Sequence, residues 1–402
     1  MKHVLAGQGI TLIEGPNFSG RSHYLKALVR KDVRRAQAVS CRSDRSSSYI
    51  GIDAHHYLSG LIPTVSGELA LHGFRNHVRH TEAVELLKSG NLTPDSIQNP
   101  LTLSGGQQVA LSLATSVLAT RNLLAIDCSL EQLSPDARQR VTEVLQGADL
   151  GMASILADNR IGEYRTNLRT AAVILRERAG VRTVPNDISV VPIDTRNDAE
   201  RIVLSKIHFG YRRCRPVFTG LDFVFEPGNV YCIEGDNGIG KSTLAKLLCG
   251  LIRPVRGQLS CGRTAKWKPW LQPGAIVAYH FQNPDLQLLS SPAADQLANA
   301  HRPIAESLGL GAFLDGHPYD LPFVLKKRLA LAITLGRSKS WLVLDEPVLG
   351  QDTANGVALA KAFDGLAAAG LGVIVITHSS WLRAQFGHPR ILRLTSHGLA
   401  EV

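Results

Sequence analysis

A glycine-rich loop in the second half of the sequence has the residues needed to bind a triphosphate. It reads Gly235-Asp-Asn-Gly-Ile-Gly-Lys-Ser242. Glycines let the backbone turn sharply, so that its N–H groups can point at phosphate oxygens. Lys241 would reach the β- and γ-phosphates, and the Ser242 hydroxyl would hold Mg²⁺. The alternative is an ordinary glycine-rich turn. The predicted phosphate-binding residues are Gly235, Asn237, Gly238, Gly240, Lys241, Ser242 and Thr243.

The residues on either side of this loop predict the elements that position it. The run 231–234 is short and apolar, as expected of a buried strand. Residues 243–249 are typical of the first turns of a helix, whose positive N-terminal end would face the same phosphates. A strand, a glycine-rich loop and a helix in this order favour the phosphate-loop interpretation over a simple turn.

The first half of the chain repeats the second half at a spacing of about 220 residues. Gly15-Pro-Asn-Phe-Ser-Gly-Arg-Ser22 matches the loop, and Leu123–Cys128 matches Trp341–Glu346. Leu-Ser-Gly-Gly-Gln at 103–107 stands where the second half has 321–325. Residues Ile155–Asp158 are matched to Val375–His378, which places Asp158 opposite His378. The repeat predicts two copies of one fold.

Strand and helix patterns alternate in each half. The runs 342–344 and 372–376 are short and apolar, as expected of central parallel strands, and 358–369 is typical of a helix between them. The sequence therefore predicts an α/β fold with tandem P-loop domains. Each would have a mostly parallel sheet flanked by helices, with a helical subdomain. We expect domains at 1–186 and 201–402 with a linker at 187–200, and only the second half has a leading β-region, at 202–225.

Composition sets broad limits on the function. The 402 residues are 44% hydrophobic and carry a net charge of +10, which suits a nucleotide, an anionic surface or no specific partner. The six cysteines are scattered, so a reducing compartment is expected and a zinc site is not. Because no apolar run approaches the length of a membrane span, any membrane role would come through partners.

Taken together, these motifs resemble the ATP-binding cassette (ABC) ATPases, as two fused nucleotide-binding domains. Within that family, Phe281–Leu288 and Asp345–Asp352 are similar to the ATPases of energy-coupling-factor importers of vitamins and transition metals. The resemblance implies an ATPase motor using ATP and Mg²⁺, and a separate transmembrane permease, possibly joined by a substrate-binding membrane subunit. Its expected location is cytoplasmic, peripheral on the inner face of the membrane.

The resemblance also assigns roles in one complete ATP site. Tyr211 would stack on adenine, unless it is simply a core tyrosine. Asp345 would orient Mg²⁺, and Glu346 would polarise the attacking water. Gln282 would contact metal and water, and His378 would bond the γ-phosphate. In the family the domains face head to tail, which would bring the signature residues across from the first half. Those residues are Ser104, Gly105, Gly106 and Gln107.

The second site implied by the resemblance is depleted. Phe18 stands where the family has glycine, Arg21 replaces lysine, and Cys128 follows Asp127 in place of glutamate. The facing signature contains Pro322, which has no backbone N–H to donate. We expect no hydrolysis there, with ATP either retained or absent. The degenerate-site residues are Gly15, Asn17, Gly20, Arg21, Ser22 and Asp127.

Two other functions remain open at this stage. One is an ABC ATPase acting on ribosomes or nucleic acid, although the short linker and the lack of an inserted coiled coil do not favour it. The other is a nucleotide-dependent regulator with little turnover, which the intact Glu346 and His378 do not favour.

Overall fold

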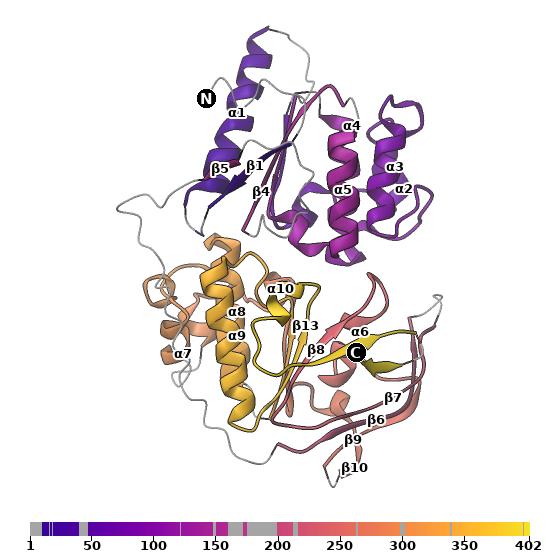
Figure 1. Ribbon diagram of the computed structural model, residues 1–402, viewed down its shortest axis with the longest axis vertical. Coiled ribbons are helices and arrows are strands. Elements are labelled where there is room, and N and C mark those ends of the chain that lie inside the picture. Colours follow the sequence, from indigo (N-terminus) through magenta and orange to yellow (C-terminus); the bar gives the residue numbers. More distant parts are fainter. Residues whose placement is uncertain are drawn as a thin grey trace. The chain divides into compact units, whose positions relative to one another are not determined.

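The chain forms two compact units, residues 1–183 and 184–402 (Figure 1). The computed structural model describes residues 10–15, 17, 19–39, 47–120, 122–147, 150–159, 172–174, 199–211, 216–262, 264–297, 302–337, 340–396 and 398–402. The predicted linker at 187–200 lies outside these ranges except for its last two residues. The domain boundaries therefore stay predictions.

Unit 1 is built on a parallel sheet of five strands in the order β2-β3-β4-β1-β5. Its strands are β1 (Ile10–Glu14), β2 (Ser47–Ile50), β3 (Leu123–Asp127), β4 (Ala153–Asp158) and β5 (Ala172–Ile174). Its helices are α1 (Arg21–Val39), α2 (Val65–Ala70), α3 (His80–Ser89), α4 (Gly105–Ala119) and α5 (Pro135–Gly147).

Alternation along the strands gives this sheet two apolar faces. Ile13 and Leu123 pack with Leu25 of α1, whereas their neighbours Leu12 and Leu124 pack in the larger core formed with α3, α4 and α5. Figure 1 shows α1 on one side of the sheet and these three helices on the other. Because both faces are covered, the strands are short apolar runs, as predicted.

Unit 2 repeats this sheet and adds to it. The order is β11-β12-β13-β8-β14-β15, with every pair parallel except β14 and β15. These strands are β8 (Val230–Glu234), β11 (Val277–His280), β12 (Trp341–Asp345), β13 (Gly372–Ile376), β14 (Arg390–Leu394) and β15 (Leu399–Glu401). The first five follow the same spatial order as the strands of unit 1, so the repeat found in the sequence is a repeat of sheet topology.

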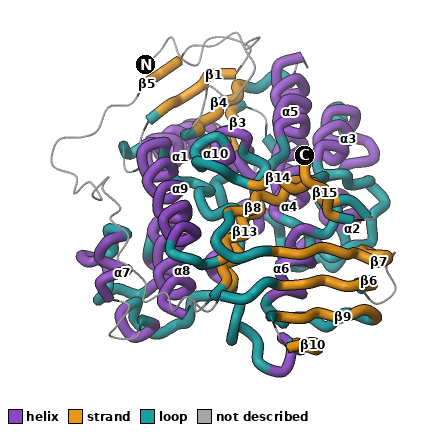
Figure 2. The backbone as a smooth tube through the Cα atoms, turned by 60° about the horizontal axis from the view of Figure 1, so that its bottom comes forward, coloured by secondary structure: helices purple, strands orange, loops and turns teal. Residues whose placement is uncertain are grey.

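The leading β-region predicted at 202–225 forms β6 and β7, and these join β9 and β10 from later in the chain in a separate antiparallel sheet of order β10-β9-β6-β7. Its strands are β6 (Ile202–Gly210), β7 (Pro216–Phe225), β9 (Arg256–Cys261) and β10 (Thr264–Trp267), which lie side by side in Figure 2. The helices of unit 2 are α6 (Lys241–Leu248), α7 (Arg302–Ser307), α8 (Phe323–Arg337), α9 (Thr353–Ala368) and α10 (Ser380–Arg383).

One predicted boundary was wrong. The helix expected at 358–369 is α9, which begins five residues earlier, at Thr353. The Asp352 carboxylate accepts a hydrogen bond from the Asn355 backbone N–H at 3.0 Å and so caps the first turn.

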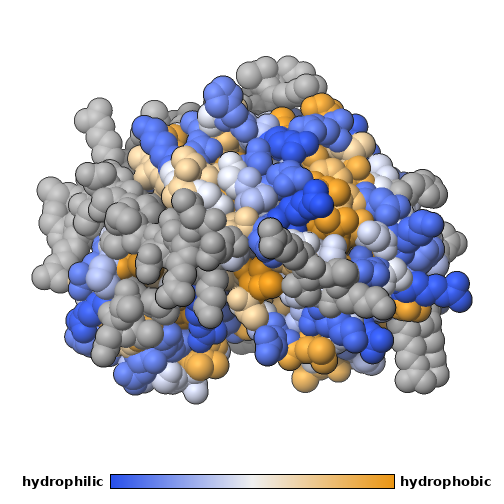
Figure 3. All heavy atoms as spheres, turned by 90° about the horizontal axis from the view of Figure 1, so that it is seen from below, coloured by the Kyte–Doolittle hydropathy of each residue, from blue (hydrophilic) through white to orange (hydrophobic). Residues whose placement is uncertain are grey.

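The surface drawn in Figure 3 shows hydrophobic side chains reaching solvent in several places between hydrophilic ones. In the parts of the chain that the structure describes, no helix is both long and apolar enough to cross a bilayer.

Candidate functional site

The phosphate loop of unit 2 connects β8 to α6 and takes a conformation that requires glycine. Gly238 and Gly240 have φ angles of 80° and 113°, in the left-handed region that L side chains rarely adopt. A Cβ on Gly240 would also lie 2.5 Å from Val217 Cγ1. The spacing of glycines therefore shapes the loop ahead of the first helical turn, as predicted.

Lys241 is the first residue of α6, and its ammonium group turns back into the loop. Its Nζ donates to the carbonyl oxygens of Gly235 at 2.7 Å and Asp236 at 2.9 Å. Burial lowers the pKa of Lys241 to about 8, although the nearby carboxylates of Glu346 and Asp345 act in the opposite direction. A bound phosphate would favour the charged form, so this amine is suited to anion binding.

Ser242 and Asp345 form an oxygen-rich pair beside the loop. The Ser242 hydroxyl donates to Asp345 Oδ2 at 2.9 Å, and the Tyr279 hydroxyl donates to the same oxygen at 3.0 Å. Burial raises the pKa of Asp345, while the two hydroxyl donors lower it. A hydroxyl and a carboxylate within hydrogen-bond distance are ligands that suit Mg²⁺, so these two residues fit the predicted metal site. Tyr279 was not predicted.

Glu346 follows directly after β12 and is held in a defined orientation. Its backbone has φ 45°, and its carboxylate accepts from Thr377 Oγ1 at 2.9 Å and from the His378 backbone N–H at 2.8 Å. Burial raises the pKa of Glu346 to about 7. A carboxylate with a pKa near neutrality is well matched to accepting a proton from water. Thr377, which positions it, was not predicted.

Tyr211 and Gln282 are the remaining predicted site residues of unit 2 whose contacts bear on their roles. Tyr211 is 43% exposed, which excludes the alternative that it is a core tyrosine, and its hydroxyl is 3.2 Å from Thr243 Oγ1. At Gln282 the recorded contact is through the main chain: its carbonyl accepts from Lys327 Nζ at 3.1 Å. Lys327 also donates to the carbonyls of Phe281 and Asp345. It therefore ties the Gln282 segment to the end of β12.

The register of the strands aligns the two units residue by residue. In unit 1, Asp127 of β3 pairs with Ala157 of β4; in unit 2, Asp345 pairs with Ile376. Ala157 therefore occupies the position of Ile376. The prediction that Asp158 corresponds to His378 was wrong by one residue, because the ends of strands cannot be counted from apolar runs alone.

With this register, Asn159 takes the place of His378 and Cys128 takes the place of Glu346. The Cys128 backbone N–H donates to Ala157 O, as that of Glu346 donates to Ile376 O. Cys128 and Glu346 share the left-handed conformation, with φ of 55° and 45°. Unit 1 thus keeps the backbone of the turn that follows β12 in unit 2 but carries a thiol where unit 2 carries the Glu346 carboxylate.

The phosphate loop of unit 1 keeps part of the predicted set. Gly15 follows β1, Asn17 is buried, Gly20 has φ 84°, and Ser22 in the first turn of α1 is exposed. Phe18 lies outside the described residues.

The signature residues of unit 1 stand at the N-terminus of α4. Ser104 is the N-cap residue, is exposed, and its backbone N–H donates to Gln107 Oε1 at 3.1 Å. Gly105 and Gly106 begin the helix. In unit 2 the matching helix, α8, begins at Phe323 directly after Pro322. Of these two matching helices, α4 alone offers a serine hydroxyl and glycine N–H groups for an anion.

Comparison with known proteins supports an ABC identity. A sequence model of the family described as ABC transporter matches residues 218–349. A Pyrococcus furiosus protein named as an ABC transporter ATP-binding protein is 32% identical over 192 residues. The matched region covers 44% of this chain and 74% of the Pyrococcus protein. A Treponema denticola protein, also named as an ABC transporter ATP-binding protein, is 25% identical. The matched region covers 69% of this chain and 63% of the Treponema protein.

A solved structure is similar over almost the whole chain. It is an archaeal ribosome recycling factor in complex with an archaeal ribosomal stalk protein, with 17% identity, a TM-score of 0.61, and coverage of 98% of this chain and 86% of the other. At this identity the likeness shows the fold, an α/β P-loop fold of ABC type. The motifs, the site geometry and the Pyrococcus relative together show that the chain belongs to the ABC transporter ATP-binding family and is an ABC-type ATPase.

Proposed function

We propose that the chain is the ATP-hydrolysing motor of an importer of the energy-coupling-factor type, with two fused nucleotide-binding domains and one active ATP site. Lys241 would bind the β- and γ-phosphates, and Ser242 and Asp345 would hold Mg²⁺, the Lewis acid that phosphoryl transfer needs. Glu346, held by Thr377, would take the proton from the attacking water. The geometry within unit 2 supports these roles.

The active site would be completed by the signature of unit 1. Ser104 offers an exposed hydroxyl at the start of a 15-residue helix, whereas the corresponding residue of unit 2 is Pro322. Under the proposal, Ser104, Gly105 and Gly106 close over the γ-phosphate at the Lys241 loop, while His378 bonds the same phosphate and Tyr211 stacks on the adenine. Hydrolysis would then release this closure and drive the membrane subunits.

The observation that carries the importer proposal is the way the Gln282 segment is presented. Gln287 donates to Ala330 O at 2.9 Å and to Thr334 Oγ1 at 2.7 Å, which fixes the segment to α8. The segment nevertheless exposes Leu286 and Leu289, at 71% and 62%. A clamped segment with exposed leucines beside the nucleotide site is suited to receive an apolar partner helix. We propose a permease at the inner face of the membrane as that partner.

Affinity purification from detergent-solubilised membranes tests this proposal. The tagged chain should bring down a polytopic membrane protein, and Leu286→Asp with Leu289→Asp should abolish this while leaving ATP binding intact. Val255→Asp is the matched control, because Val255 is 70% exposed on a different segment. If the double variant keeps its membrane partner, the proposed docking segment is wrong.

The second candidate is a ribosome-acting ABC ATPase, favoured by the likeness in fold to the archaeal recycling factor. The same purification separates the two. Ribosomal particles recovered without any integral membrane protein would replace the importer proposal with this one.

A further inference from the structure

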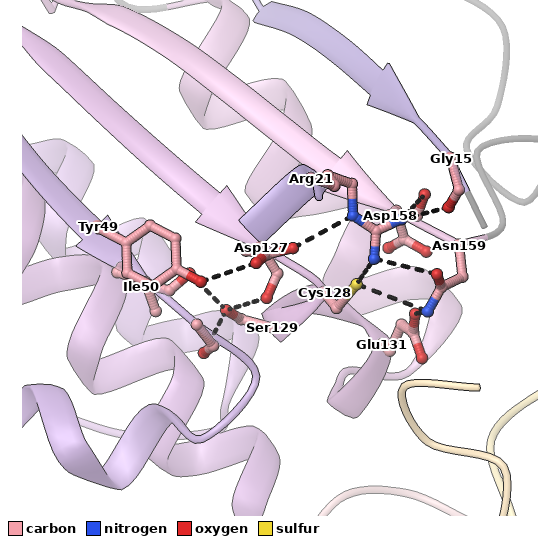
Figure 4. Close-up of polar contacts among 11 residues, drawn as sticks. Gly15, Arg21, Tyr49, Ile50, Asp127, Cys128, Ser129, Glu131, Asp158 and Asn159 are labelled. Atoms are coloured by element: carbon pink, nitrogen blue, oxygen red, sulfur yellow. Dashed lines mark hydrogen bonds and ion pairs between the residues drawn. The ribbon is translucent and has the colours of Figure 1, made fainter. Parts of the chain in front are cut away.

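The side chain of Arg21 in unit 1 reaches well beyond its own phosphate loop. Its Nη1 donates to Gly15 O at 2.8 Å and to Asp158 O at 3.1 Å. Its Nη2 donates to Cys128 Sγ at 2.8 Å and to Asn159 Oδ1 at 3.0 Å. Figure 4 shows the guanidinium among these groups, at the ends of the strands. The side chain is only 7% exposed, so the guanidinium lies inside the protein.

The terminal nitrogens of the guanidinium, Nη1 and Nη2, both donate to protein groups, which leaves neither directed at a phosphate. Arginine carries five N–H groups, and four of them belong to the two terminal nitrogens just described. The fifth, on Nε, faces Asp127, whose Oδ1 lies 3.4 Å away. Asn159 is in turn fixed by its amide, which donates to Glu131 Oε1 at 3.0 Å. The cation is therefore held by four hydrogen bonds from its terminal nitrogens and by an ion pair with Asp127, in which the buried Nε makes no hydrogen bond.

The corresponding groups in unit 2 are held separately from each other. Lys241 bonds carbonyl oxygens of its own loop, and Glu346 is held by the turn after β13. In unit 1 the guanidinium of Arg21 reaches from the loop carbonyl of Gly15 to Cys128 and Asn159, the residues that replace Glu346 and His378. The γ-phosphate and the attacking water would need the space that it fills.

The metal position is altered as well. In unit 2 the Mg²⁺ carboxylate, Asp345, accepts from Ser242. In unit 1 the matching Asp127 accepts from Tyr49 at 2.7 Å and is paired with Arg21, while Ser22 is exposed. The positive charge that Mg²⁺ would bring to this carboxylate is supplied by the guanidinium.

Electrostatics favour this arrangement. Burial alone would lower the pKa of Arg21, but the surrounding groups, Cys128 first and then Asp127, Asp158 and Glu131, outweigh it and raise the pKa. Burial raises the pKa of Cys128 well above its usual value, so the sulfur is a neutral thiol acceptor. Expelling the arginine would leave buried carboxylates facing a triphosphate, which is unfavourable.

We propose that Arg21 closes the phosphate loop of unit 1, so that this loop binds no nucleotide and the chain binds one ATP in total. The guanidinium with its five partners takes over the structural role that MgATP has in a loaded site. This inference rests on the proposed function only in assigning the one ATP to the Lys241 loop.

Binding stoichiometry tests the inference on the full chain. Equilibrium dialysis of the Glu346→Gln variant with MgATP should give one ATP per chain, and adding Lys241→Ala should reduce this to none. Two ATP per chain, or one ATP that survives Lys241→Ala, would overturn it. A chain that binds one ATP but lacks turnover or a membrane partner would contradict the proposed function and leave this inference intact.

A stability measurement tests the network itself. Arg21→Ala should lower the thermal unfolding midpoint by at least about 5 °C, because it leaves buried acceptors and a carboxylate without their cation. Arg30→Ala is the matched control, since Arg30 is an exposed arginine of the same helix, and it should change the midpoint by less than about 1 °C. Equal midpoints for the two variants would contradict the network.

Discussion

Replacing Glu346 by glutamine isolates one step of the chemistry. Glutamine has the same shape, and its carbonyl oxygen can still accept from the His378 N–H, while its amide can donate to Thr377 Oγ1. The loop contacts of Lys241 and the Ser242–Asp345 pair are untouched. The substitution therefore removes the proton acceptor and leaves the binding groups in place.

The expected loss follows from the size of such effects. General base catalysis typically contributes about 10²–10⁴-fold, so kcat should fall by at least about a hundredfold while the Kd for MgATP changes by less than about threefold. The pH profile gives a second readout. Burial raises the pKa of Glu346 to about 7, so the wild-type rate should decline as the pH falls through that value, as the carboxylate becomes protonated. The variant should lack this decline.

Single-turnover hydrolysis and equilibrium nucleotide binding measure both quantities. Thr377→Val is a useful companion, because it removes the hydroxyl that holds Glu346 but keeps the carboxylate. Its kcat should fall by less than that of Glu346→Gln, and the pH at which its rate declines on the acid side should shift. If Glu346→Gln retains more than about a tenth of wild-type turnover, Glu346 is not the base and the assignment of roles in unit 2 is wrong.

Three further outcomes follow from the same geometry. Ser104→Arg should abolish turnover at the Lys241 loop, and near-normal single-turnover rates would refute a site completed from unit 1. Cys128→Ala should lower turnover only modestly, since unit 1 has no base to lose; a rate as low as that of Lys241→Ala would make unit 1 catalytically essential. MgATP affinity should fall as the pH rises through about 8, where unliganded Lys241 loses its proton, and calorimetry in two buffers should show proton uptake on binding above that pH.

Local patterns predicted much of this protein. The glycines at 238 and 240 predicted a loop, and both take left-handed backbone conformations that other residues rarely adopt. The apolar runs predicted strands, because a strand covered on both faces of its sheet needs apolar side chains on both sides. The repeat predicted two copies of one α/β fold, and the two parallel sheets share one strand order. Each of these motifs is a short run of neighbouring residues, and the repeat is the same set of runs met twice, so a single sequence is enough to find them.

Contacts between distant segments were not predictable in the same way. Tyr279 and Asp345 are 66 positions apart, yet a hydrogen bond from the Tyr279 hydroxyl joins them and orients the carboxylate that we propose holds Mg²⁺. The register that assigns Asn159 to the position of His378 depends on how β4 lies against β3, and apolar runs do not show where a strand ends. The sequence therefore identified the chemistry better than the residues that position it.

Arg21 shows what this difference means for function. From the sequence, an arginine in place of lysine keeps the charge, and nucleotide binding remains possible. In the folded unit the planar guanidinium reaches five partners on three segments, which the single ammonium of a lysine could not satisfy at once. Cys128 and Asn159 accept hydrogen bonds without adding charge, so the residues that appear as losses of catalytic groups are also the ones that accommodate the arginine. Under our proposal, the arginine and the groups that accept its hydrogen bonds together fill the space that a bound metal and phosphate would take in unit 1.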